Sequence, residues 1–304
     1  MTKTVKILMA TFNGAKFIKR QLESILDQNH KDWQLVISDD GSVDATIKII
    51  NTFISANPKY DIKLIKGPRN GFVCNFLSML QDVNSDYVCF CDQDDIWLPD
   101  KLSNSILKLD GAYQPTCYGA RTLLIDENEE VYGASPRFKK PATFRNALVQ
   151  NFAGGNTMMI NGAGVELLQK VYNKKYIPVS HDWWVYLIIS GAGGEIIYDK
   201  TPCVFYRQHG GNLIGSNQSF SDRFSRIRYL FLGKYKKWND TNLGILLNEM
   251  YILTPENKEI LEEFVRARTV SIFKRFFIIH QIGVYRQTFF GNLALKVAVL
   301  FNKV

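Results

Sequence analysis

The sequence predicts an α/β fold in which a mixed, mainly parallel sheet is flanked by helices and followed by a C-terminal helical appendage. Two observations support this. The first hundred residues alternate short apolar runs with segments of helical periodicity, a rhythm typical of a parallel sheet covered on both faces. After about residue 216 the chain has helical and basic character to its end.

Four runs rich in β-branched and aromatic residues are expected to form the first strands. They span residues 5–10, 33–38, 62–66 and 87–91. The segments between them, residues 15–28, 45–56 and 72–83, have helical spacing. In the first helix Ile18, Leu22 and Ile25 fall on one apolar stripe.

The rhythm changes after residue 115, where we expect a mixed second half that completes the sheet. Residues 118–125 and 131–133 read as a hairpin whose turn is the acidic stretch 126–129. A helix at 142–149, a strand at 157–160 and a helix at 162–172 are expected to follow.

Composition favours a cytoplasmic globular protein. The chain has 304 residues, of which 46% are apolar and 22% charged, and these are ordinary values for such a domain. The apolar run at residues 5–10 is too short for a signal peptide, and no run has the length of a membrane span. The five cysteines include no CxxC pair, so we expect reduced, buried thiols.

The net charge of +8 is unevenly placed. Residues 223–237 hold six basic residues and no acidic one, and the chain after Glu263 adds seven Lys or Arg, again without an acid. Bulky apolar residues outnumber what base stacking needs, so we expect no nucleic-acid partner. Basic amphipathic helices at an anionic membrane surface explain both features. Packing of these helices on the first domain or in a homo-oligomer is the alternative.

The strongest chemical signal is Asp92-Gln93-Asp94-Asp95, directly after the strand at 87–91. Three carboxylates this close repel one another unless a cation or a sugar hydroxyl binds there. Mg²⁺ or Mn²⁺ prefers oxygen ligands and commonly bridges a carboxylate to substrate phosphates. The alternative is a solvated acidic turn in which Asp95 caps the next helix.

Three further strand ends are polar. Asp40 follows the second strand, where a carboxylate can accept from a pyrimidine base; alternatively, Asp40 or Ser42 caps the next helix. Thr11-Phe12-Asn13-Gly14 follows the first strand, and Arg69 lies in a glycine-flanked loop after the third. Because ligands bind beyond the carboxyl ends of parallel strands, these four ends together predict a nucleotide site.

The motifs as a set resemble glycosyltransferase family 2, whose members have the GT-A nucleotide-diphosphosugar fold. The resemblance rests on residues 9–13, 38–44 and 92–95, and it covers roughly residues 4–215 in the right order. Residues 92–102, 181–184 and 206–210 are similar to the bacterial rhamnosyltransferase branch of that family. We therefore expect a GT-A catalytic domain over residues 1–215 and a basic helical region over residues 216–304.

The resemblance also implies roles for individual residues. Nucleotide and donor-sugar contacts are expected from Thr11, Asn13, Asp40, Arg69, Asp92 and Arg207. Asp94 would bind the metal on the diphosphate. Asp182 matches the family's catalytic base, preceded here by His181 where many relatives have a glutamate.

Two more elements complete the expected site. His209, in a glycine-rich segment, could close over the diphosphate and coordinate the same metal through its imidazole. Acceptor-side contacts are expected from Gly155, Asn156, Trp183 and Trp184. The alternative for the segment at 181–184 is a helix start that Asp182 caps, with both tryptophans packed in the core.

Displacing a nucleoside diphosphate needs a base for the acceptor hydroxyl and a cation for the leaving group. With no separate nucleophile evident, we expect a single displacement with inversion. The expected reaction transfers L-rhamnose from dTDP-β-L-rhamnose to a lipid-linked or growing cell-surface polysaccharide, at the cytoplasmic face of a membrane. The alternatives are a UDP-hexose donor, or a non-catalytic scaffold that binds a nucleotide sugar.

Overall fold

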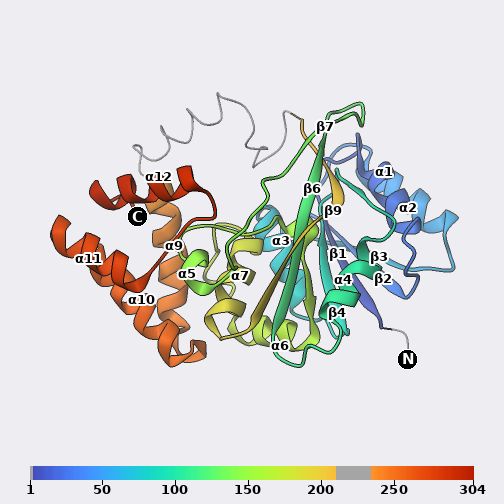
Figure 1. Ribbon diagram of the computed structural model, residues 1–304. Helices are drawn as coiled ribbons and strands as arrows, with labels where there is room; N and C mark the ends of the chain where they lie inside the picture. Colours follow the sequence, from blue (N-terminus) through green and yellow to red (C-terminus); the bar gives the residue numbers. More distant parts are fainter. Residues whose placement is uncertain (1–2, 210–233) are drawn as a thin grey trace. The chain divides into compact units, whose positions relative to one another are not determined.

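The computed structural model describes residues 3–209 and 234–304 (Figure 1). Its contacts divide the chain into two compact units. Unit 1 comprises Met1–Arg137, Ala153–Lys175 and Ile197–Ser216, and unit 2 comprises Phe138–Phe152, Tyr176–Ile196 and Asn217–Val304. In these units two earlier segments of the chain pack with the C-terminal helices, and the expected division into a catalytic domain over residues 1–215 and a helical region over 216–304 stays a prediction. Most of the basic stretch at 223–237, and the glycines after His209, lie outside the described residues.

The sheet of the described chain has nine strands in the order β3-β2-β1-β4-β8-β6-β9-β5, with β7 paired to β6. Its parallel part is formed by β1 (Val5–Thr11), β2 (Trp33–Asp39), β3 (Asp61–Lys66) and β4 (Tyr87–Cys91). The remaining strands are β5 (Ile96–Trp97), β6 (Thr116–Ile125), β7 (Val131–Ala134), β8 (Met159–Asn161) and β9 (Glu195–Arg207). Antiparallel pairing joins β4 to β8, β8 to β6, β6 to β7 and β9 to β5. The predicted mixed, mainly parallel sheet is confirmed.

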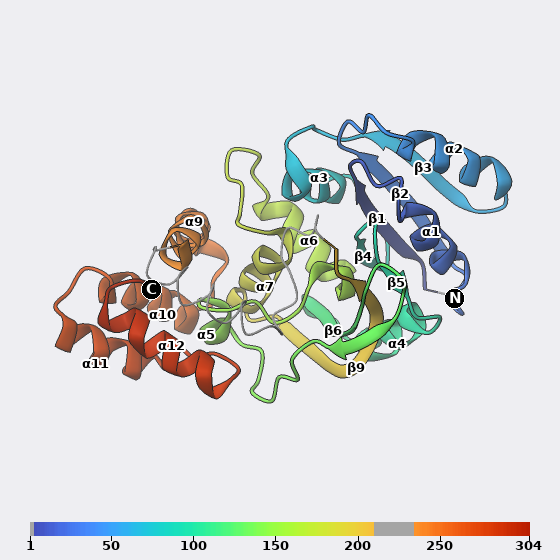
Figure 2. The same cartoon turned by 90° about the horizontal axis from the view of Figure 1, so that it is seen from above.

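The helices of unit 1 cover this sheet. They are α1 (Ile18–Leu26), α2 (Thr46–Ala56), α3 (Gly71–Leu80), α4 (Lys101–Leu109), the short 3₁₀ turn η1 (Gly155–Thr157) and α6 (Gly162–Val171). Figure 2 shows α1 and α2 on one face of the parallel strands and α3 on the other. This follows from right-handed crossovers that run one way from β1 to β3 and then back to β4. The predicted stripe of Ile18, Leu22 and Ile25 is buried.

The central strand β4 is buried at every residue. Cys89 and Cys91 lie within it, and burial raises the pKa of Cys89 to about 11. Cys117 and Cys203 are buried as well, and Cys74 is half-buried. All five thiols are free, and Cys74 is less buried than expected.

The described part of unit 2 is helical apart from short connections and the first two residues of β9. Its helices are α5 (Phe144–Ala147), α7 (His181–Gly191), α9 (Lys234–Asn248), the 3₁₀ turn η2 (Met250–Ile252), α10 (Pro255–Ala267), α11 (Ile272–Ile282) and α12 (Phe289–Leu300). Every residue of α7 except Asp182 is buried. Within residues 3–209 and 234–304, no helix combines the length and apolarity needed to cross a bilayer.

Candidate active site

The polar loops that follow β1, β2 and β4 lie at one edge of the sheet. In the parallel register, Thr11 of β1 lies beside Asp39 of β2, and Met9 of β1 lies beside Cys91 of β4. The segments that follow these strands, residues 12–14, 40–42 and 92–95, therefore begin side by side. This is the edge at which the sequence predicts a nucleotide site.

Asn13 joins the first two of these loops. Its backbone N–H donates to Ser42 Oγ at 2.8 Å, and its side-chain Oδ1 accepts from the Val43 N–H at 2.9 Å. Its φ of 48° is in the left-handed region, which asparagine tolerates better than most residues. Asp39 holds the second loop by accepting from the backbone N–H groups of Gly41 and Ser42. Asn13 thus positions the loop, and its contact with a donor stays a prediction.

Asp40 ties the second loop to the start of α3. Its two carboxylate oxygens accept from the backbone N–H groups of Arg69 at 2.6 Å and Gly71 at 2.8 Å. The Arg69 side chain is exposed and passes over Gly41, where an added Cβ would lie 3.1 Å from Arg69 Nε. The structure therefore brings Asp40 and Arg69 together, as expected of a nucleotide-binding pair. Asp40 thus bonds to the start of α3, whereas the alternative drawn from the sequence has it capping α2, the next helix along the chain.

Gln93, for which the sequence patterns predict no role, connects the loop after β1 (residues 12–14) to the acidic loop after β4 (residues 92–95). Its Oε1 accepts from the Thr11 hydroxyl at 2.7 Å and from the Phe12 N–H at 2.9 Å, while its Nε2 donates to the Phe12 carbonyl. A side chain at Gly14 would collide with it, since an added Cβ would lie 2.2 Å from Gln93 Oε1. The buried Thr11 hydroxyl therefore helps to hold the two loops together.

Asp94 and His209, the two predicted metal ligands, meet although they lie 115 residues apart. His209 Nε2 is 2.8 Å from Asp94 Oδ2, and the two side chains are 16% and 18% exposed. The Phe17 ring packs against the imidazole with 4.8 Å between ring centroids. A carboxylate oxygen and an imidazole nitrogen in reach of solvent are suitable ligands for Mn²⁺ or Mg²⁺.

In the described part of the chain, no cluster of three or more His, Cys, Asp or Glu could hold a metal by itself. Mg²⁺ usually takes one or two protein ligands and completes its shell with phosphate oxygens and water. Asp94 and His209 fit such a site. Asp92, which is half-buried, opens the same loop.

Asp95 has a different surrounding from its neighbour Asp94. Its side chain is fully buried and accepts from Asn156 Nδ2 at 2.6 Å and from the Arg207 backbone N–H at 3.1 Å. Burial, together with the charges of Asp94 and Asp92, raises the pKa of Asp95 well above its usual range. The expected alternative of a solvated cap does not apply to this residue, because it anchors the acidic loop from inside.

This anchor also accounts for the predicted acceptor-side element of unit 1. Gly155 begins η1, and both Gly155 and Asn156 are buried. The Asn156 amide is directed to Asp95. Asn156 therefore supports the loop that carries Asp94, and direct contact of Gly155 or Asn156 with an acceptor remains a prediction.

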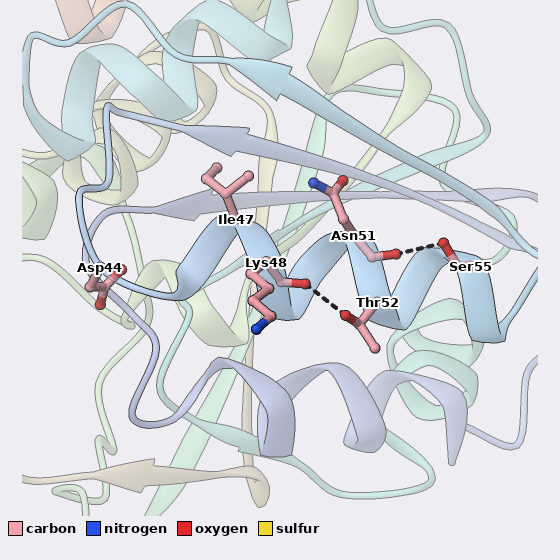
Figure 3. Close-up of a pocket in the computed structure, with 6 residues that line it drawn as sticks. All are labelled: Asp44, Ile47, Lys48, Asn51, Thr52 and Ser55. Carbon is pink, nitrogen blue, oxygen red and sulfur yellow. Dashed lines mark hydrogen bonds between the residues drawn. The ribbon is translucent and has the colours of Figure 1, made fainter.

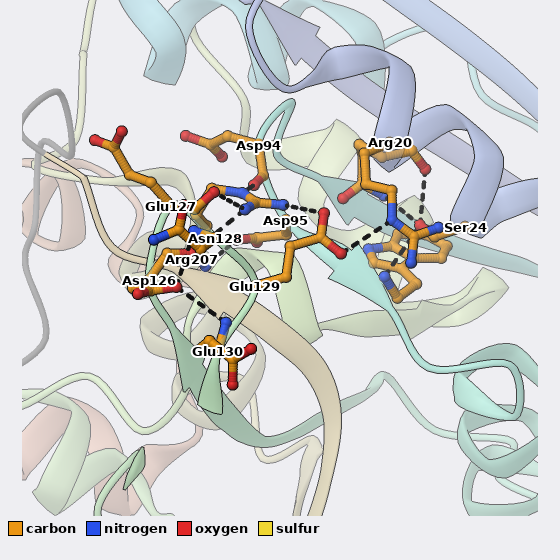
Figure 4. Close-up of polar contacts among 12 residues, drawn as sticks. Arg20, Ser24, Asp94, Asp95, Asp126, Glu127, Asn128, Glu129, Glu130 and Arg207 are labelled. Atoms are coloured by element: carbon orange, nitrogen blue, oxygen red, sulfur yellow. Dashed lines mark hydrogen bonds and ion pairs between the residues drawn. The ribbon is translucent and has the colours of Figure 1, made fainter. Parts of the chain in front are cut away.

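Arg207 supports the same loop with its guanidinium, which is only 2% exposed. Nε donates to the Asp94 carbonyl at 3.0 Å, and Nη1 donates to the carbonyls of Asp126 and Glu127 (Figure 4). Nη2 donates to Glu129 Oε1 at 3.1 Å. The hydrogen bonds of the guanidinium are made to protein groups, and the expected contact of Arg207 with the donor stays a prediction.

The partners of Arg207 belong to the acidic turn, residues 126–130 between β6 and β7. Glu129 accepts from both Arg207 and Arg20, the latter at 3.3 Å, and Glu127 pairs with Lys16. The Lys16 ammonium lowers the pKa of Glu127. The acidic turn is thus held by basic side chains from the start of α1 and the end of β9, and this pairing had no signal in the sequence.

Asp182 lies in unit 2 at the start of α7. Its Oδ1 accepts from the Ser180 hydroxyl and from the Trp183 N–H at 2.7 Å. Trp183 and Trp184 are both buried, and Trp183 Nε1 donates to the Ala147 carbonyl at 2.7 Å. Their position matches the alternative of core packing, and an acceptor-side role stays a prediction. Burial lowers the pKa of His181 to about 4.

A hollow of about 730 Å³ lies along α2, away from these contacts (Figure 3). It is lined by Asp44, Ile47, Lys48, Asn51, Thr52 and Ser55. The hydroxyls of Thr52 and Ser55 donate to carbonyls of their own helix. Because one helix and its leading turn supply the whole lining, we assign no site to it.

Comparison with known proteins agrees with this geometry. Residues 6–171 match the family model described as glycosyl transferase family 2. The dTDP-rhamnosyl transferase RfbG of Shigella flexneri is 31% identical over 245 residues, which cover 75% of this chain and 81% of that protein.

Two solved structures share the fold at low sequence identity. TarS of S. aureus, residues 1–349 in complex with UDP-GlcNAc, has a TM-score of 0.57 at 14% identity and covers 92% of this chain and 90% of its own. The mannosyltransferase PcManGT from Pyrobaculum calidifontis, in complex with GDP-Man and Mn²⁺, has a TM-score of 0.52 at 16% identity, with 98% and 85% covered. They confirm the predicted GT-A fold. The chain therefore belongs to glycosyltransferase family 2 and is a glycosyltransferase similar to rhamnosyltransferases.

Proposed function

We propose that this protein transfers L-rhamnose from dTDP-β-L-rhamnose to a saccharide acceptor, with inversion at the anomeric carbon. The observation that carries the proposal is the pair of Asp94 and His209, placed 2.8 Å apart beside the loops of β1 and β2. The similarity to a dTDP-rhamnosyl transferase supports the choice of donor.

The loops around this pair are suited to a nucleoside diphosphate. Asp40 and Arg69 lie together at the start of α3 and would contact the pyrimidine, and Asp92 would contact the ribose or the donor sugar. A Mg²⁺ or Mn²⁺ ion held by Asp94 and His209 would offset the charge that develops on the leaving diphosphate. Arg207, Gln93 and Asp95 hold these loops in place, so little reorganisation is needed when the donor binds.

Asp182 is the proposed general base. The acceptor hydroxyl oxygen forms a bond to the anomeric carbon while the bond from that carbon to the diphosphate breaks. The hydroxyl proton moves to Asp182, and dTDP leaves with the electron pair. Hydrogen bonds from Ser180 and Trp183 to Oδ1 orient the carboxylate for this step.

We place the reaction at the cytoplasmic face of a membrane, with the protein bound peripherally. The acceptor in this proposal is a lipid-linked saccharide or a growing cell-surface polysaccharide. The basic, apolar C-terminal helices support this location, because an anionic leaflet attracts basic segments.

The test is release of nucleotide from a panel of nucleotide sugars, measured by chromatography with Mn²⁺, with Mg²⁺ and with EDTA. We expect dTDP release from dTDP-rhamnose that depends on metal and exceeds release from UDP-hexoses. Preference for a UDP-hexose would contradict the proposed donor and keep the mechanism. If no nucleotide sugar is hydrolysed or bound, the proposal fails.

A further inference from the structure

The last two helices of unit 2 present phenylalanines outward. On α11, Phe273, Phe276 and Phe277 share one face because they are three and four residues apart. On α12 the outward face holds Phe289, Leu293 and Leu300, flanked by Phe290 and Phe301. Phe273, Phe277, Phe289 and Phe290 are between 69% and 86% exposed. We call these two surfaces the aromatic faces.

The opposite sides of both helices are firmly packed. Ile278, Ile279 and Ile282 of α11 are buried, as are Leu295, Ala298 and Val299 of α12. The buried Arg275 guanidinium donates to the carbonyls of Ala267, Val270 and Val299, at 2.9 to 3.1 Å. It therefore fixes α11 to the end of α10 and to α12. The helices have a complete inward face, so the phenylalanines are an additional apolar surface.

The charge on this part of the chain has one sign. No acidic residue occurs after Glu263. Arg266 pairs with Glu263, and Arg268 pairs with Asp240. Lys274 and Lys296 are exposed, and among the described residues no acidic side chain forms an ion pair with either. The aromatic faces are thus bordered by positive charge.

An anionic bilayer suits both properties. Short amphipathic helices lie in the interface with their aromatic side chains at the acyl boundary and their basic side chains among the headgroups. With 11 and 12 residues, α11 and α12 are of a length for lying on a bilayer rather than crossing it. A second copy is a poorer partner, because a symmetric contact of these faces would oppose like charges.

We propose that the aromatic faces of α11 and α12 dock this protein onto an anionic lipid bilayer, with the phenylalanines inserted below the headgroups. The inference deepens the proposed function, since it rests on the membrane location given there and names the surface that makes the contact. It requires neither a donor nor an acceptor.

The test is co-sedimentation of the full chain with vesicles of phosphatidylcholine, with and without phosphatidylglycerol. The variant is Phe273→Ser with Phe289→Ser. The matched control is Tyr113→Ser with Tyr251→Ser, which removes two aromatic side chains that are 94% and 72% exposed elsewhere. We expect the wild type and the control to bind the anionic vesicles, and the phenylalanine variant to partition roughly tenfold or more weakly. Added salt should weaken binding of the wild type.

Equal binding by the phenylalanine variant and the wild type would overturn the inference, as would the absence of wild-type binding to anionic vesicles. Light scattering without vesicles measures whether the protein is a monomer or a dimer. If the wild type is a dimer and the phenylalanine variant a monomer, the aromatic faces bind a second copy of the chain and the inference is overturned. Circular dichroism melts show whether each variant is folded. If donor hydrolysis is seen without vesicle binding, this inference alone fails; vesicle binding without hydrolysis leaves it standing and refutes the proposed reaction.

Discussion

Charged side chains are buried in one region of the molecule and exposed in another. The first is the strand-end site of unit 1, formed by residues 12–14, 40–42 and 92–95 and their partners, and the second is the aromatic faces of unit 2. In the site, Asp95 and Arg207 are buried and hydrogen-bonded to protein groups. On the aromatic faces, exposed lysines lie beside exposed phenylalanines. Buried charges are costly unless they are paired, whereas exposed ones are solvated at little cost. The first region therefore suits a small ligand that is bound in one fixed position. The second suits a bilayer, whose headgroups have no fixed positions.

Within the site the same contrast separates neighbouring residues. Asp94 is in reach of solvent and meets His209, while the adjacent Asp95 is buried against Asn156. Arg207 Nε donates to the backbone carbonyl of Asp94, while the Arg207 backbone N–H donates to the carboxylate of Asp95. Residues that support the loop should thus affect stability, and residues at its open side should affect ligand binding.

The largest effect is expected for Asp182→Asn. An asparagine amide cannot take the proton from the acceptor hydroxyl, so the rate of transfer should fall by about 10²- to 10⁴-fold. The affinity for dTDP should stay unchanged. Transfer of labelled sugar to a membrane extract, together with calorimetric titration of dTDP, measures both. Glu166→Gln, which changes an exposed carboxylate on α6, is the control. Near-normal transfer by the Asp182 variant would remove it as the base.

Arg207→Lys sharpens the distinction between support and binding. Lysine cannot reproduce the fork that reaches both the Asp94 carbonyl and Glu129, so the free energy of unfolding should fall by about 2–4 kcal/mol. Urea unfolding measures this, with the exposed Arg137→Lys as the control. A variant of unchanged stability that binds dTDP more weakly without metal would instead make Arg207 a donor ligand.

Asp94→Ala should weaken metal-dependent binding and leave the free energy of unfolding unchanged. Affinity for dTDP in Mn²⁺ should fall at least about tenfold, because the loss of even an outer partner of a metal site costs that much. Affinity in EDTA should not change. Calorimetry compares the variant with Asp110→Ala, an exposed carboxylate at the end of α4. An equal loss with and without metal would show that Asp94 contacts the nucleotide directly.

The smallest effect concerns the buried His181. Its pKa is 6.5 in an ordinary setting and about 4 in the folded protein, so between these values the unfolded chain binds more protons. Stability contributed by the neutral ring is therefore lost as the pH falls below 6.5, by about 1.4 kcal/mol per pH unit at most. Urea unfolding at pH 7 and pH 5 should show a steeper loss for the wild type than for His181→Asn. Parallel losses would mean that His181 does not titrate as its burial indicates.

The order of strands and helices was predictable because it depends on local periodicity. The strands at 5–10, 33–38, 62–66 and 87–91 and the three helices between them are confirmed within a few residues. The pairing of Asp94 with His209 was expected because an imidazole beside glycines can coordinate the metal that Asp94 binds; no local pattern in the sequence connects residues so far apart.

Other features depended on tertiary contacts that no local pattern encodes. Asp95 and Asp94 are identical residues in sequence, and only the fold buries one of them. The role of Arg207 depends on the acidic turn, 78 residues away at Glu129. The grouping of α7 with the C-terminal helices reflects packing, as does the choice of which phenylalanines face outward.

The central claim is that Asp94 and His209 hold a metal on a nucleoside diphosphate at the strand-end site. A crystal structure of the wild type soaked with dTDP and Mn²⁺, with anomalous diffraction data for manganese, tests it most directly. We expect one manganese peak that contacts Asp94, His209 and the diphosphate, with the pyrimidine beside Asp40. A nucleotide bound elsewhere, or a diphosphate at this edge whose manganese contacts neither Asp94 nor His209, would contradict it.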